Sequence, residues 1–214
     1  MSSSLHLPRW FLKFAFHLFY NQLAWTYNLV AWLVSFGQWG TWRRTATLFL
    51  HEGLILELGH GTGGLMADMT ARNLPVIGLD LSPYMARQAQ RRLRRQGANP
   101  RLVRGQAQDL PFPDASFANV VATFPTEFIL EPQTLTSIAR VLQPGGCLVM
   151  VVMGYLKGPD PLRGFIDWLY RITGQREIPE PKPLARLKEL DFTARWEDAT
   201  LDGAKARLLV ATRH

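Results

Sequence analysis

A glycine-rich turn directly after an apolar run constrains the fold of this chain more than any other feature. The run Leu54-Ile55-Leu56-Glu57-Leu58 is β-prone and is followed by Gly59-His60-Gly61-Thr62-Gly63-Gly64. Apolar and helix-forming residues come next, from Leu65 to Ala71. This order predicts a buried strand, a tight loop and the start of a helix, which is where α/β folds bind nucleotides.

A second apolar run, Val76–Asp80, ends in a carboxylate about 20 residues further on, the spacing at which an acidic group meets ribose hydroxyls. The two runs together predict a cofactor that contains adenosine. The glycines leave the kind of cofactor open. Gly59, Gly61 and Gly64 fit the dinucleotide fingerprint of a nicotinamide oxidoreductase. Glu57, two residues before the first glycine, favours a different family of cofactor-binding enzymes.

Four segments, in order, resemble the motifs of class I S-adenosylmethionine-dependent methyltransferases. They are Glu57–Gly63, Gly78–Met85, Gly105–Phe117 and Ala139–Val149. The resemblance implies that the glycine loop lies against the amino-acid end of the cofactor. It also implies that Asp80 binds the ribose hydroxyls and that Gln106 accepts a hydrogen bond from the adenine amino group. Relatives usually carry an Asp at the position of Gln106, whose amide oxygen can accept the same bond.

The resemblance implies S-adenosyl-L-methionine as the cofactor. The implied contacts are Glu57, Gly59, His60, Gly61, Thr62, Gly63, Asp80, Leu81, Gln106, Ala107 and Thr123. Glu57 is expected to organise the loop or to bind the methionine ammonium group. Because the cofactor carries the reactivity, neither a metal cluster nor a catalytic triad is required. A cofactor-binding module without turnover stays open as an alternative.

From residue 48 onward the chain alternates between apolar runs and helical patterns, which predicts a parallel, doubly wound sheet. Strands are expected at 54–58, 76–80, 101–104, 118–123 and 146–153, and helices at 63–72, 83–96 and 131–142. Runs at 192–197 and 205–212, about a turn at 201–203, resemble the sixth and seventh strands of the methyltransferases. The expected fold is therefore α/β and Rossmann-like, with a mostly parallel seven-stranded sheet, an antiparallel C-terminal strand and N-terminal helices.

Residues 1–45 are unusually aromatic, and residues 9–36 are expected to form helices with a wide apolar face. We interpret residues 1–45 as a lid or membrane-contact segment and 46–214 as the methyltransferase domain, in which 154–182 cover the substrate. The net charge of +7 suits peripheral contact with an anionic membrane. No basic stripe interleaved with exposed aromatic residues is evident, so nucleic acid is not expected. No secretory signal is evident either, which predicts a cytoplasmic location, with or without contact to the inner face of the membrane.

The segment Tyr27–Gly37, continued to Trp42-Arg43-Arg44, resembles the N-terminal signature of ubiquinone/menaquinone biosynthesis methyltransferases, with Asn28 in place of an Asp. Phospholipid N-methyltransferases of bacteria include similar members. The resemblance implies that Tyr27 lies near the methyl-transfer site, and Glu127 is the other candidate catalytic residue. An Asn- and Arg-containing motif of the quinone enzymes is replaced here by Thr123–Glu127. The expected acceptor is a phospholipid amine headgroup or a quinone precursor; a soluble small molecule methylated on oxygen or nitrogen is the alternative.

Overall fold

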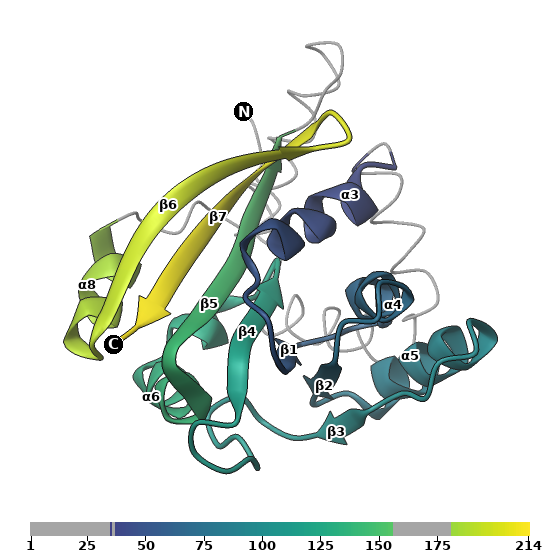
Figure 1. Ribbon diagram of the computed structural model, residues 1–214, viewed down its shortest axis with the longest axis horizontal. Helices are drawn as coiled ribbons and strands as arrows, with labels where there is room; N and C mark the ends of the chain where they lie inside the picture. Colours follow the sequence, from purple (N-terminus) through teal and green to yellow (C-terminus); the bar gives the residue numbers. More distant parts are fainter. Residues whose placement is uncertain (1–34, 36, 156–180) are drawn as a thin grey trace, which may run out of the picture.

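The computed structural model describes residues 35, 37–155 and 181–214 (Figure 1). The expectations for Tyr27, for helices within 9–36 and for most of the insertion at 154–182 fall outside these residues. The N-terminal elements are helix α3 (Trp39–Arg44) and the 3₁₀ helix η1 (Thr45–Phe49). Among the described residues, none of the helices has the length and apolar character needed to cross a bilayer.

Strands and helices then alternate. The strands are β1 (Ile55–Leu58), β2 (Val76–Asp80), β3 (Leu102–Arg104), β4 (Phe117–Thr123), β5 (Leu142–Tyr155), β6 (Phe192–Leu201) and β7 (Ala204–Arg213). The helices are α4 (Gly64–Ala71), α5 (Pro83–Arg95), η2 (Glu127–Leu130), α6 (Pro132–Val141) and α8 (Pro181–Glu189). The strands and helices expected between residues 54 and 142 are confirmed to within a few residues.

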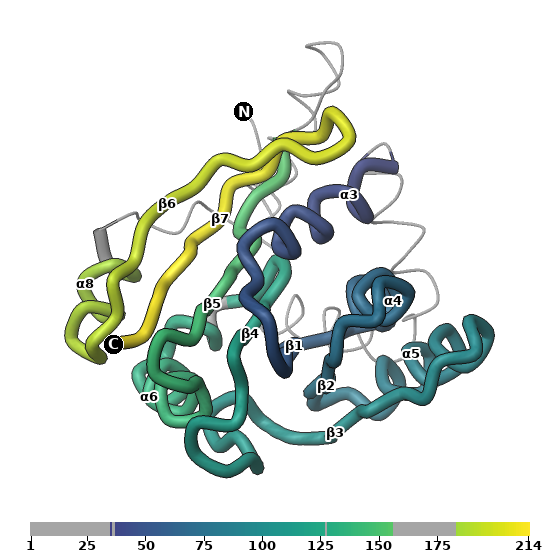
Figure 2. The backbone as a smooth tube through the Cα atoms, viewed as in Figure 1, coloured from purple at the N-terminus to yellow at the C-terminus, as the bar shows by residue number. Residues whose placement is uncertain are grey.

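The seven strands form one sheet in the order β3-β2-β1-β4-β5-β7-β6. Neighbouring strands from β3 to β5 are parallel, and β7 runs antiparallel to both β5 and β6. Figure 2 shows the long β6–β7 hairpin returning the chain to the sheet, so that the C-terminus lies near the start of β6. There the amide of His214 donates to the carbonyl of Asp191 at 3.0 Å. The predicted fold class is confirmed.

Helices cover the two faces of the sheet (Figure 1), and an apolar layer lies on each face. One contains Leu56 and Leu58 of β1 together with residues of α6 and α8. The other contains Ile55 of β1 and residues of α3, α4 and α5, among them Trp42 and Met66. Because side chains alternate along a strand, Glu57 must face the layer of α3 and α4.

A few elements differ from the sequence-based expectations. Strand β5 begins at Leu142, which pairs with Phe117, and the register shifts before Cys147 pairs with Asn119. Residues 143–145, which lie between the expected helix and the expected strand, therefore belong to one long, irregular strand. Helix α8 and the 3₁₀ helices η1 and η2 were not predicted, because their short sequences show no clear helical period. Helix α3 lies within the N-terminal segment in which helices were expected, although no range was predicted for it.

Helices α4 and α5 pack closely against each other at Gly63. Its φ is +71°, and a Cβ there would lie 2.7 Å from Cβ of Ala89 on α5. Gly97 has a similar φ of +73°, but no described atom lies within 4 Å of its added Cβ. Gly97→Ala should cost about 1–2 kcal/mol of unfolding free energy for its backbone alone. Gly63→Ala should cost about 1–3 kcal/mol more, because it also overpacks the interface. Urea unfolding measures both; equal losses would contradict the packing argument.

Candidate functional site

The loops that follow β1, β2, β3 and β4 lie at one edge of the sheet, since parallel strands end on the same side. The amide of Gly59 donates to the carbonyl of Leu79 at 2.8 Å, which ties the glycine loop to the end of β2. The amide of Gly105 donates to the carbonyl of Asp80 at 3.4 Å. A Cβ built on Gly59 would lie 4.0 Å from the ring of Phe128, so η2 borders the same loop.

The carboxylate of Asp80 joins two of these loops. Its Oδ2 accepts a hydrogen bond from the amide of Gly61 at 2.9 Å, and its Oδ1 accepts one from the amide of Ser82 at 2.8 Å. Ser82 in turn caps α5, accepting from the amide of Met85 at 3.4 Å. Asp80 is only 4% exposed. It therefore organises the backbone around the site, in addition to any contact with a ligand.

The outer side of the glycine loop is open to close approach. Gly59, Gly61 and Gly63 have φ values of +66°, +53° and +71°. A Cβ on Gly59 or Gly61 would meet no described atom nearer than 4.0 Å, whereas one on Gly63 would clash with α5. Gly63 is thus required by packing. The other two glycines leave the main chain bare for a ligand.

Glu57 carries a carboxyl group into the apolar layer beneath α3 and α4. The residue is 2% exposed, and its Oε2 has no hydrogen-bond partner within the described part of the chain. Burial raises the pKa of Glu57 from 4.5 to about 8, and the positive charge of Arg43 opposes the rise. Near neutral pH this carboxyl group is therefore largely protonated. A buried polar atom without a partner is costly, and a cationic ligand at this position would satisfy it.

His60 offers a second buried acceptor beside the loop. Its Nδ1 lies 2.8 Å from the carbonyl oxygen of Gly61, which can only accept, so Nδ1 carries the proton. Burial lowers the pKa of His60, against the opposing effect of Asp80, and favours the neutral ring. Nε2 then presents a lone pair, is buried and has no hydrogen-bond partner in residues 35, 37–155 and 181–214. Gly78 makes room for the ring, since a Cβ there would lie 2.9 Å from Cδ2 of His60.

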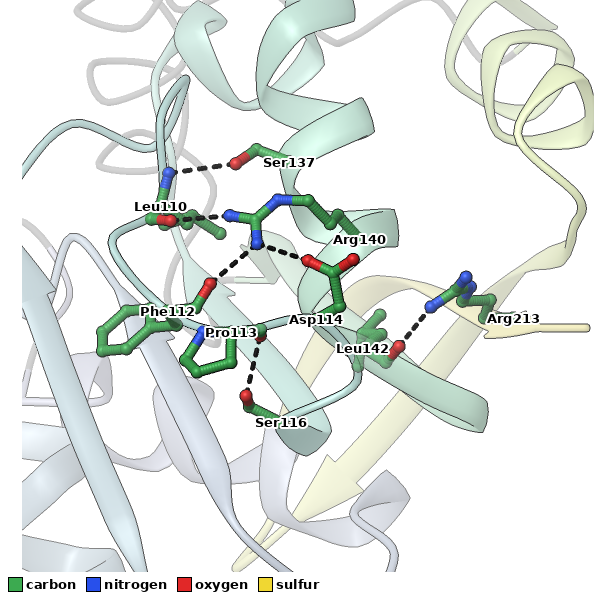
Figure 3. A network of polar contacts seen from close by, with 9 residues as sticks. All are labelled: Leu110, Phe112, Pro113, Asp114, Ser116, Ser137, Arg140, Leu142 and Arg213. Atoms are coloured by element: carbon green, nitrogen blue, oxygen red, sulfur yellow. Dashed lines mark hydrogen bonds and ion pairs between the residues drawn. The ribbon is translucent and has the colours of Figure 1, made fainter.

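Helix α6 holds the loop that carries Gln106 and Ala107. Figure 3 shows the guanidinium of Arg140 reaching from α6 to the loop. It donates to the carbonyl oxygens of Phe112 and Leu110, both at 2.7 Å, and to Asp114 at 2.8 Å. The hydroxyl of Ser137 accepts from the amide of Leu110 at 3.0 Å. These bonds fix the far end of the loop and thereby the position of its first residues.

An aromatic group lies at the end of β4. Phe124 has a φ of +48°, which is strained for a bulky residue, and its amide donates to the carbonyl of Val151 at 2.7 Å. Its ring stacks on Trp39 of α3, with 4.1 Å between centroids and 23° between planes. Trp42 meets both rings edge-on. Backbone strain of this kind is concentrated at functional sites, which makes the pair a candidate wall for an acceptor.

The predicted cofactor contacts all belong to these four loops or to the ends of the strands that precede them. Glu57, His60, Thr62, Gly63, Asp80 and Ala107 are buried, Gly61 and Thr123 are half-buried, and Gly59, Leu81 and Gln106 are exposed. The backbone of Glu127 opens η2 beside the glycine loop, while its side chain and all of Tyr27 lie outside the described parts. The sequence did not predict the supporting roles of Arg43 and Arg140. Ser82 before Pro83 is a sequence signal for the start of a helix, and Ser82 does cap α5. Arg43 is part of the segment Trp42-Arg43-Arg44 that carried the resemblance to the quinone enzymes.

The raised pKa of Glu57 predicts a pH-dependent stability. Between pH 4.5 and about 8 the folded protein holds a proton that the unfolded chain has lost, so stability falls as pH rises. The unfolding free energy should drop by up to about 1.4 kcal/mol per pH unit relative to Glu57→Gln, which cannot titrate. Urea unfolding between pH 5 and 8 measures this difference. Glu52→Gln, at an exposed position, is the matched control and should parallel the wild type; parallel curves for Glu57→Gln would refute the prediction.

Comparison with known proteins agrees with this arrangement. A family described as "Methyltransferase domain" matches residues 55–146. A demethylmenaquinone methyltransferase of Thermus thermophilus is 35% identical over 166 residues, covering 75% of this chain and 73% of that protein. A phosphatidylethanolamine N-methyltransferase of Cereibacter sphaeroides is 36% identical over 113 residues, covering 51% and 55%.

A solved SAM-dependent methyltransferase of Thermotoga maritima has the same fold. Its TM-score is 0.64 at 18% identity, over 92% of this chain and 98% of that one. The nicotinamide alternative depended on Gly64 as the third glycine of a dinucleotide fingerprint. The structure gives Gly64 another purpose, because the guanidinium of Arg43 occupies the space of its missing side chain. From the matched domain, the relatives and the fold together, the chain belongs to the S-adenosylmethionine-dependent methyltransferases.

Proposed function

We propose that this methyltransferase holds S-adenosylmethionine along the four loops, with its amino-acid end over the glycine loop and its adenosine towards β3. The supporting observation is a pair of buried atoms that can accept hydrogen bonds and have no partner among the described residues, Glu57 Oε2 and His60 Nε2. They lie beside glycines whose outer sides are open. An ammonium group is a donor that suits both acceptors. The proposed contacts are Glu57, Gly59, His60, Gly61, Thr62, Gly63, Asp80, Leu81, Gln106, Ala107 and Thr123.

The cofactor supplies an electrophilic methyl group on a sulfonium, so the chain itself has to position the acceptor and exclude water. Asp80 would accept from ribose hydroxyls with the lone pairs left over from its two backbone bonds. Gln106, exposed at the start of its loop, would meet the adenine amino group. Thr123, at the end of β4, would lie between the cofactor and the acceptor.

We further propose that the acceptor is hydrophobic and membrane-associated, with a phospholipid amine headgroup or a quinone precursor as the candidates. The stacked Trp39 and Phe124 support this proposal, since they place aromatic surface beside Thr123. The relatives named above act on a menaquinone precursor and on phosphatidylethanolamine, as their names state. The net charge of +7 would favour approach to an anionic bilayer. Tyr27 and Glu127 remain the proposed catalytic residues.

Asp80→Ala should weaken the binding of S-adenosylhomocysteine by about 1–3 kcal/mol, because charge-assisted hydrogen bonds and the loop anchors are lost together. Isothermal titration calorimetry measures this change. Asp109→Ala removes a carboxylate from an exposed loop position and should leave the affinity unchanged. An unchanged affinity for Asp80→Ala would remove Asp80 from the site. Binding of NAD in preference to S-adenosylhomocysteine would overturn the proposed cofactor site as a whole.

The acceptor can be identified with methyl-deuterated S-adenosylmethionine and a bacterial lipid extract. Mass spectrometry should find the label in amine phospholipids or in quinones. Trp39→Ala should slow lipid methylation by about 3- to 10-fold, the equivalent of an aromatic contact of 0.5–1.5 kcal/mol, with unchanged affinity for S-adenosylhomocysteine. Tyr84→Ala is the control: it removes an exposed aromatic side chain of α5 and should change neither the rate of lipid methylation nor the affinity for S-adenosylhomocysteine. Label found only in added soluble amines or phenols would favour a soluble acceptor instead.

A further inference from the structure

Arg43 extends from α3 to the first residue of α4. A Cβ built on Gly64 would lie 1.9 Å from Nη1 of Arg43 and 2.5 Å from both Cζ and Nη2. These distances place the guanidinium directly against the backbone at the start of α4. Gly64 has no positive φ that would require glycine, so its missing side chain is explained by this contact.

The same guanidinium lies close enough to Glu57 to influence its ionisation. Among the groups around Glu57, the charge of Arg43 is the strongest that lowers its pKa, while Asp80 and Asp68 raise it. The glycine loop is thus bordered by one buried carboxyl group and one half-buried guanidinium. The N-terminal end of α4, with its positive dipole, lies on the guanidinium side.

This pairing of charges matches a zwitterion. The amino-acid end of S-adenosylmethionine carries an ammonium and a carboxylate. Glu57 and His60 can accept hydrogen bonds from the ammonium, but neither supplies a positive charge for the carboxylate. A guanidinium binds a carboxylate with two parallel hydrogen bonds, which an ammonium side chain cannot do. We propose that Arg43 binds the cofactor carboxylate, opposite Glu57, and that Gly64 is needed to admit its side chain. The inference rests on the proposed position of the cofactor.

Arg43→Met tests the proposal when two ligands are compared by calorimetry. S-adenosylhomocysteine has the amino-acid end, and 5′-methylthioadenosine lacks it. Arg43→Met should weaken S-adenosylhomocysteine about 10- to 100-fold and leave 5′-methylthioadenosine unchanged, since charged hydrogen bonds contribute about 1.5–3 kcal/mol. Arg44→Met is the matched control: Arg44 is the next residue on the helix, but it pairs with Asp202 at 3.0 Å. It should change neither affinity.

Gly64→Ala provides a second variant that leaves Arg43 in the chain. Alanine is a better helix former than glycine, so the variant should fold. Its Cβ would displace the guanidinium and should lower the affinity for S-adenosylhomocysteine selectively, as in Arg43→Met. If Arg43→Met leaves both affinities unchanged, or weakens both ligands equally, the proposed role of Arg43 is overturned. If the wild type binds neither S-adenosylhomocysteine nor 5′-methylthioadenosine, the proposed function itself is refuted.

Discussion

The two hydrogen bonds accepted by Asp80 are the contacts on which the site depends. One fixes the amide of Gly61 in the loop after β1, and the other fixes the amide of Ser82 before α5. A single buried carboxylate therefore sets the spacing between two neighbouring loops. The carbonyl oxygen of Asp80 accepts a hydrogen bond from the amide of Gly105, which brings the loop after β3 to the same place. The geometry of three loops is therefore coupled through one residue.

The two faces of the sheet differ in the residues that they bury. The layer under α6 and α8 is apolar and supports the loop of Gln106 through Arg140. The layer under α3 and α4 accommodates Glu57 and Arg43 within apolar surroundings, where charge interactions are stronger than in water. Such a layer is costly to maintain unless a ligand satisfies its polar groups. This cost is physically consistent with a site for a charged, zwitterionic cofactor.

Helix α3 connects the start of α4 to the aromatic residue at the end of β4. Its Arg43 lies against α4, while its Trp39 stacks on Phe124. Trp42, between them in sequence, lies close to Gly154 of β5, where a Cβ would lie 2.1 Å from its ring. One helix of six residues thus contacts both regions. A change in the position of α3 would shift its contacts with α4 and with Phe124 together.

Local patterns in the sequence determined the strands, the helices α4, α5 and α6 and the loops that follow β1 and β2. Alternating apolar residues and glycine spacing depend on neighbours in the chain, and so Glu57, Gly61, Gly63 and Asp80 could be located without coordinates. The tertiary structure decided which groups meet. The approach of Arg43 to Gly64, of Arg140 to Leu110 and of Trp39 to Phe124 joins residues 21 to 85 positions apart. These contacts depend on how the helices pack on the sheet. Contacts between side chains of different elements produce no periodic pattern in the sequence, so they could not be predicted from it.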